Sequence, residues 1–295
     1  MQRLVAAIIL CLSAGSAGAI DIGLRQTLGS DDYKGTYGYL EIGAGALSIR
    51  PEADLFTSDK TTASFKTFAA RLGYDTSILG LGVTGGATPE EDDYSNAFAG
   101  ADATLTFSAT GGGRKRIRTS GGGAPRGRGL ARVDAGAGAL VTKHEDKLNA
   151  ARTTLANKFE VTQTDLSVFA GASFVGIHAS ANLTQSDYNK TLTASDRPAQ
   201  RLKLDGVNMR LEGFPETSLT LHAEIPFLPL INPFVTYNRT SYKASTLTTR
   251  VFSVGAHVGL EMLEVFGAFE ALHPSVGKDS TAVTVGASLR FGLGG

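Results

Sequence analysis

Apolar and polar residues alternate along most of this chain, most clearly in the segment 280–291, S-T-A-V-T-V-G-A-S-L-R-F. From Thr281 to Phe291 every second residue belongs to a largely apolar set, and the residues between them are small or polar. Successive side chains of a β-strand point to opposite faces, so this pattern predicts a strand with one apolar face. The same alternation predicts strands at 20–28, 36–49, 67–74, 79–83, 97–107, 133–141, 166–174, 177–183, 202–211, 219–225, 234–242, 252–260 and 263–269. The strand at 202–211 is expected to be broken at Asp205-Gly206.

Polar segments between these strands are predicted to be loops. They are Pro51–Lys60, the acidic Gly86–Asn96 and Thr184–Gln200. The proline-rich segment Pro226–Pro233 is expected to be a connection, because proline cannot donate a ladder hydrogen bond. No amphipathic helix of useful length interrupts the pattern, so the chain is expected to be a single all-β domain.

The length of the strands and the contrast between their faces favour a membrane barrel. The predicted strands are about ten residues long, close to what a tilted bilayer crossing requires. One face carries Val, Leu, Phe and Ala, whereas the other carries Gly, Thr, Ser and scattered charges. We therefore expect one antiparallel transmembrane β-barrel of about 12 strands, within a range of roughly 10–14. The alternative is a secreted or periplasmic β-sandwich, and the absence of Trp, a residue favoured at membrane interfaces, counts toward it.

The segment 280–291, with its terminal aromatic Phe291, resembles the C-terminal strand of bacterial outer-membrane β-barrel proteins. Four residues, Gly292–Gly295, follow that aromatic, whereas proteins of this class usually end on it. The resemblance implies a location in the bacterial outer membrane among its lipids and lipopolysaccharide. It also implies recognition by the barrel-assembly machinery during insertion.

The first nineteen residues have the composition of a secretory signal peptide. Arg3 supplies the positive charge, Leu4–Leu12 is apolar, and Ala17-Gly18-Ala19 provides small residues for cleavage. The barrel domain is then expected to span 20–295. The only cysteine, Cys11, lies inside the predicted signal. Basic and acidic residues are equal in number, 28 each, so no overall charge points to a nucleic-acid partner.

A glycine-rich basic segment at 110–129 interrupts the pattern, and it is expected to be a loop. Its cationic residues are candidates for binding anions such as lipopolysaccharide phosphates: Arg114, Lys115, Arg116, Arg118, Arg126 and Arg128. The segment contains no aromatic residue for stacking on nucleic-acid bases. A surface-binding or adhesion protein is therefore one alternative function. A solvated insertion without a ligand is the other interpretation.

Charged and polar residues on the non-apolar face are candidates to line the lumen. They are Arg71, Asp102, Arg132, Asp134, His178, Ser180, His222, Glu224, His257 and Arg290. Such residues can line an aqueous path and set its ion preference, or they can pair with one another and fill the interior. The favoured function is a non-enzymatic, porin-like passive pore or a structural membrane protein.

The triplet His178-Ala179-Ser180 supports a second alternative, a lipid hydrolase. Residues two apart on a strand share a face, so His178 could activate Ser180 for acyl transfer. The His-x-Ser spacing is similar to that of outer-membrane lipid A deacylases. No metal-ligand spacing or phosphate-binding motif is present, so neither a metal, a cofactor nor a catalytic residue is assigned.

Overall fold

The computed structural model describes residues 18–58, 64–91, 94–108, 131–146, 159–175, 177–192, 201–204, 207–210, 213–225, 230–243, 246–260 and 262–293. The strands are β1 (Gly18–Gly29), β2 (Lys34–Ala44), β3 (Leu47–Thr57), β4 (Phe65–Asp75), β5 (Leu79–Glu91), β6 (Tyr94–Ser108), β7 (Ala131–Asp146), β8 (Phe159–Phe174), β9 (Ile177–Tyr188), β10 (Arg201–Leu204), β11 (Val207–Arg210), β12 (Pro215–Glu224), β13 (Ile231–Tyr242), β14 (Thr248–Leu260), β15 (Leu263–Pro274) and β16 (Ser280–Leu293).

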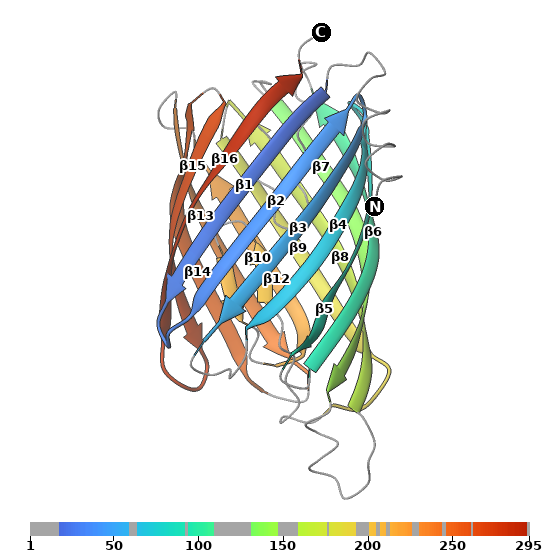
Figure 1. Cartoon of the computed structure of the whole chain (residues 1–295), viewed down its shortest axis with the longest axis vertical. Coiled ribbons are helices and arrows are strands. Elements are labelled where there is room, and N and C mark those ends of the chain that lie inside the picture. The colour runs from blue at the N-terminus through green and yellow to red at the C-terminus, as the bar shows by residue number, and fades with distance from the viewer. Residues whose placement is uncertain are drawn as a thin grey trace, which may run out of the picture.

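Fourteen of the described strands form one closed antiparallel barrel (Figure 1). Each of these strands pairs with the next one along the chain, except that β9 pairs with β12. The barrel closes where β1 pairs with β16, from Gly18 opposite Leu293 to Gly29 opposite Ala282. The expected antiparallel barrel is confirmed and a two-sheet sandwich is wrong, but the described strands of the barrel number 14 rather than about 12.

Strand β3 accounts for much of the difference in strand count, because the segment Pro51–Lys60 was expected to be a loop. Instead Pro51 lies inside β3, opposite Ala70 of β4. On the other side, the pairing of β2 with β3 is interrupted between Tyr39↔Glu52 and Ile42↔Ile49. The missing N–H of proline is thus accommodated by a gap in one ladder while the other ladder continues.

Two other boundaries also differ from the expectation. The acidic segment expected to be a loop continues β5 to Glu91, with an irregular register between Thr88 and Glu91. Strand β9 extends to Tyr188, past the predicted start of a loop at Thr184. The segment 202–211 is interrupted where a break was expected, at Asp205-Gly206: β10 and β11 lie on either side of it, and they form a hairpin separate from the barrel. Pairing with neighbouring strands therefore extends β5 and β9 into polar segments whose composition alone predicts loops.

The outer surface of the barrel is apolar. Leu72, Val83, Val168 and Val254 point outward, and each is between 56% and 59% exposed. The residues on the alternate positions of the same strands are buried or half-buried and are mainly polar or glycine. A belt of exposed apolar side chains around a closed barrel matches the hydrocarbon interior of a bilayer. Among the described residues, no helix has the length and apolar character needed to cross a membrane.

The two ends of the barrel differ in their connections. We call the end at which β1 begins and β16 finishes the terminal end, and the other the opposite end (Figure 1). Strands β2 and β3 are joined at the terminal end by two residues, Gly45 and Ala46, and Gly45 adopts a φ of 59°. The ends of β6 and β7 that flank the predicted basic loop also lie at the terminal end. The loop residues themselves, like residues 1–17 of the predicted signal peptide, lie outside the described residues.

The lipid-facing role of the outer surface can be tested at Val168, near the middle of β8. We expect Val168→Arg to lower the free energy of unfolding by about 2–4 kcal/mol in lipid vesicles, because it places a charge against hydrocarbon. Urea unfolding, followed by the far-ultraviolet circular dichroism of the β-sheet, measures the effect. Val168→Leu is the control and should stay within about 1.5 kcal/mol of the parent. Equal stability of the two variants would contradict the lipid-facing assignment.

Candidate functional site

The barrel lumen is the candidate functional site. All ten residues predicted to line it lie on the inner face of their strands, where each is buried or half-buried. Ion pairs join two couples among them, Arg71 with Asp102 and Arg132 with Asp134. Their participation in transport stays a prediction.

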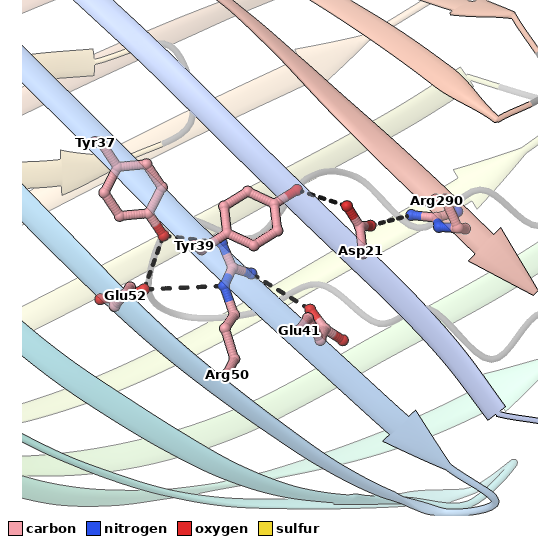
Figure 2. A network of polar contacts seen from close by, with 7 residues as sticks. All are labelled: Asp21, Tyr37, Tyr39, Glu41, Arg50, Glu52 and Arg290. Atoms are coloured by element: carbon pink, nitrogen blue, oxygen red, sulfur yellow. Dashed lines mark hydrogen bonds and ion pairs between the residues drawn. The ribbon is translucent and has the colours of Figure 1, made fainter. Parts of the chain in front are cut away.

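A polar network crosses the seam at which the barrel closes (Figure 2). Arg290 of β16 donates a hydrogen bond from Nη2 to Asp21 Oδ2 of β1 at 2.7 Å. Tyr39 of β2 donates from its hydroxyl to the other oxygen of Asp21 at 3.1 Å. The side chains therefore link three neighbouring strands across the closure.

Arg50 of β3 continues the seam network on its other side (Figure 2). Its guanidinium lies 4.0 Å from the centre of the Tyr39 ring, a cation–π contact. Arg50 Nη2 donates to the Tyr37 hydroxyl at 2.9 Å, and that hydroxyl donates to Glu52 at 2.8 Å. The guanidinium also forms ion pairs with Glu41 at 3.7 Å and with Glu52 at 3.9 Å. Two carboxylates thus share one cation.

Arg71 and Asp102 form a bidentate ion pair across one strand. Arg71 lies on β4 and Asp102 on β6, and Arg71 Nη2 donates to Asp102 Oδ1 at 2.7 Å while Nη1 donates to Oδ2. Between them, β5 presents Gly82, where a Cβ atom would lie only 1.9 Å from Arg71 Nη2. The glycine therefore gives the guanidinium room to lie flat against the wall and reach its partner.

Arg132 and Asp134 pair on β7 near the terminal end. Arg132 Nε lies 2.8 Å from Asp134 Oδ2, and Thr106 donates to Asp134 Oδ1 at 2.5 Å. Asp134 is 1% exposed, so this carboxylate is held by its partners and not by bulk water. Glu224 is also buried at this end of the lumen, on β12.

Three imidazoles form a row along the inner wall near the terminal end. The rings of His178 and His222 lie 6.4 Å apart, and Phe234 stands between His222, at 5.7 Å, and His257, at 5.2 Å. His257 pairs with Glu264 at 2.8 Å. Within the part of the chain that the structure describes, no three residues of the metal-ligating types converge on one point.

His178 does not form a catalytic pair with Ser180 in this structure. Its Nδ1 is bonded to Ser173 Oγ at 2.8 Å, across the β8–β9 pairing. Ser180 lies opposite His222 of β12, on the inner wall. The shared face that the sequence predicts is present, yet the hydrogen bond that would activate the serine is not among the contacts of the described residues.

An arc of aromatic rings, which sequence reasoning missed, lines the lumen at the opposite end. The contacts run from one ring to the next in the order Tyr33, Phe56, Phe65, Tyr94, His144, Phe214 and Tyr188. Phe56, Phe65, Tyr94 and Phe214 are each at most 5% exposed. The alternation of strand faces was the available signal. Phe65 and inward-facing Arg71 lie an even number of positions apart on β4, so both side chains point to the same face. The aromatic arc narrows this mouth of the barrel.

The described residues that flank the connection between β9 and β12 pack inside the barrel at the same end. These flanking residues, Leu192 and Phe214, are buried against Val161, which faces inward from β8. The hairpin of β10 and β11 belongs to this connection and lies against β14 and β15, within the outline of the barrel (Figure 1). The lumen is therefore narrowed by a backbone segment as well as by side chains.

A cavity of about 300 Å³ remains inside the lumen, beside strands β3 to β9. Hydroxyl and amide side chains form much of its wall, including Thr84, Asn96 and Asn182. Its charged lining residues are Glu52, Asp54, Arg71, Asp102 and Asp165. A space of this size holds several water molecules or a small polar solute.

Carboxylates outnumber arginines on the inner face of the described strands. The arginines are Arg25, Arg50, Arg71, Arg132 and Arg290. The carboxylates are Asp21, Glu41, Glu52, Asp54, Asp75, Asp102, Asp134, Asp165, Glu224, Glu264 and Glu270. Three of these carboxylates, Asp102, Asp134 and Glu224, are among the lumen candidates named from the alternation.

No protein-family model matches this sequence, and no curated protein matches it either. Solved structures of similar fold include OccAB1 from Acinetobacter baumannii, 9% identical over 95% of this chain and 97% of that chain, with a TM-score of 0.48. The KdgM porin is 7% identical over 92% of this chain and 99% of that chain, with a TM-score of 0.42. CdiB from Acinetobacter baumannii is 8% identical, with a TM-score of 0.50, over 93% of this chain but 60% of its own length. These likenesses concern the fold alone, which is that of bacterial outer-membrane β-barrel proteins.

The Arg71–Asp102 pair gives a test of the lumen contacts. We expect Asp102→Asn to lower the free energy of unfolding by about 1–3 kcal/mol, because it leaves a largely buried guanidinium without its counter-charge. The midpoint of urea unfolding in vesicles measures the change. The double variant Arg71→Gln/Asp102→Asn removes both charges and should recover most of the loss. A double variant no more stable than Asp102→Asn would show that the pair does not act as a unit.

Proposed function

We propose that this protein is a passive pore of the bacterial outer membrane that admits small polar solutes. The proposal rests on one observation, a closed barrel whose outer face is apolar and whose inner face is polar and charged around a cavity. An apolar exterior holds the barrel in lipid, and a polar interior lowers the cost of moving a hydrated solute through it. The same interior gives a purely structural protein no evident advantage.

The strand number is consistent with a narrow path. Barrels of about 8 strands are filled by their own side chains, whereas those of roughly 16–18 strands leave an aqueous channel. The described barrel, with 14 strands, falls between these cases. Its aromatic arc and the inward connection between β9 and β12 reduce the opening further. We therefore expect passage of ions and small solutes rather than of large ones.

The terminal end is assigned to the periplasm and the opposite end to the outside. Periplasmic turns of bacterial barrels are short, like the one between Ala44 and Leu47. Lipids and lipopolysaccharide would then surround the apolar belt, and β16 would be the strand read by the barrel-assembly machinery. With this orientation the basic segment 110–129 is connected to strand ends on the periplasmic side. That position makes lipopolysaccharide phosphates of the outer leaflet a less accessible ligand for it.

The hydrolase alternative receives little support from the geometry. The imidazole of His178 is engaged by Ser173, and both His178 and Ser180 face the lumen rather than the lipid. A lipid ester in the bilayer would have to cross the barrel wall to reach them. Release of fatty acid from lipid substrate that disappears in Ser180→Ala would restore this alternative.

The pore is tested by conductance of the purified protein in a planar bilayer. We expect discrete steps of current, because a single barrel opens one aqueous path at a time. The insertion of a folded barrel is checked first by electrophoresis in SDS, in which the unboiled protein should migrate differently from the boiled one. A heat-modifiable barrel that carries no current would overturn the pore and leave a structural or adhesive role.

Phe214 offers a variant that should change the size of the path. Its ring lies 5.1 Å from His144 and 5.5 Å from Tyr188, and its backbone carbonyl accepts a bond from the Lys243 N–H. Phe214→Ala removes these ring contacts, at a cost of about 3–5 kcal/mol, and opens space at this mouth of the barrel while the backbone bond to Lys243 is retained. We expect a higher single-channel conductance than in the parent.

The control for Phe214→Ala is Phe252→Ala, which truncates a ring that is 48% exposed on the outer face. Its conductance should equal that of the parent, since it leaves the lumen untouched. Unchanged conductance in Phe214→Ala would show that the aromatic arc does not limit the path.

A further inference from the structure

We propose that the lumen prefers positively charged solutes, and that Asp165 in the cavity is a selectivity-determining residue. This inference rests on the proposed pore function and assigns the class of solute that the pore favours. It follows from how the charges on the inner wall are paired. Solutes bearing an ammonium or guanidinium group, together with simple cations, are the class that fits.

The arginines of the lumen are largely neutralised by carboxylates. Arg71 is held by Asp102, Arg132 by Asp134, and Arg290 by Asp21. Arg50 is shared between two carboxylates, Glu41 and Glu52. A guanidinium in such a pair presents little net charge to a passing anion, because the field of each charge is cancelled by its partner at short distance.

Asp165 on β8 is held differently. Its Oδ1 accepts hydrogen bonds from Gln163 Nε2 at 2.7 Å and from Ser186 Oγ at 2.5 Å. Gln163 is itself positioned by His144, whose Nε2 lies 3.0 Å from the amide oxygen of Gln163. Among the described residues, both hydrogen-bond partners of the Asp165 carboxylate are neutral side chains. These bonds orient the carboxylate and stabilise its ionised form, but they do not cancel its charge.

The cavity beside Asp165 contains a further hydrogen-bond acceptor without a donor. Asn96 lines this cavity and is 6% exposed, and its Oδ1 has no hydrogen-bond partner in the described part of the chain. The amide is oriented by its other atom, because Nδ2 donates to the Tyr94 hydroxyl at 3.1 Å. A buried acceptor of this kind costs free energy until a donor arrives.

The cavity thus combines an uncancelled carboxylate with an unsatisfied amide oxygen. Asp54 and Glu52 add carboxylates to the same wall, and Arg71, the cation of the wall, is already bound to Asp102. A cation carrying N–H groups can satisfy both requirements, whereas an anion meets like charge at the carboxylate. A narrow, low-dielectric path strengthens this discrimination.

The experiment is the reversal potential of the purified pore in a planar bilayer that separates two concentrations of potassium chloride. The reversal potential gives the ratio of potassium to chloride permeability. We expect the parent to favour potassium. We expect Asp165→Asn to lower the ratio by a factor of about five, the Boltzmann equivalent of one unit-charge contact in water.

Asp187→Asn is the matched control. In the β8–β9 pairing, Asp165 lies opposite Ser186, and Asp187 is the next residue along β9. The two aspartates therefore lie at the same level along the barrel axis. Asp187, however, is exposed on the outer face. The same change of charge should therefore leave the permeability ratio as it is in the parent. A heat-dependent shift in SDS, measured for all variants, confirms that each one forms a barrel.

The outcomes separate this inference from the pore itself. A barrel that conducts with a reversal potential at zero or toward chloride keeps the pore and overturns the cation preference. A potassium preference that Asp165→Asn leaves unchanged, or that Asp187→Asn lowers equally, overturns the role of Asp165. A folded barrel with no current overturns the pore and this inference together. A potassium preference reduced by Asp165→Asn alone supports both.

Discussion

Closure of the sheet is the constraint on which the rest of the structure depends. A bilayer supplies no hydrogen-bond partners, so every backbone group of a spanning strand must find one on a neighbouring strand. The pairing of β1 with β16 meets this requirement by removing the two edges that an open sheet would have. The ion pair between Asp21 and Arg290 then ties the same two strands on the inner side.

Closure also separates the side chains into two populations with different chemistry. Outward residues meet lipid and are apolar, whereas inward residues lie in a confined space with little water. Charges confined in this way must be paired or hydrogen-bonded. Glycines such as Gly82 make room for the larger partners, so that Arg71 reaches Asp102 across a whole strand. The charged groups of the lumen are consequently arranged in local pairs. The carboxylates in excess of those pairs give the lumen a net negative charge.

The two ends of the lumen have different characters. Near the terminal end, His178, His222 and His257 form a row in which Phe234 lies between the last two rings, and the row stands beside paired charges. At the opposite end, the aromatic arc and the inward connection replace charge with packing. A solute crossing the barrel would therefore pass an apolar narrowing, an acidic cavity and an imidazole-lined section. This arrangement fits selection by charge after selection by size.

The sequence by itself determined the all-β class, the antiparallel barrel and, within the strands that it predicted, the side of the wall on which a residue lies. Alternation with a period of two is a local property, so residues such as Arg71 and Asp102 could be assigned to the inner face from their own strands. The strand at Pro51 escaped prediction because the cost of a missing N–H depends on which neighbour would have accepted its bond. Only the tertiary structure decided which inward residues meet. It paired His178 with Ser173 rather than Ser180, brought Phe214 to His144, and gave Asp165 only neutral partners among the described residues. These contacts depend on the number and register of the strands that closure fixes.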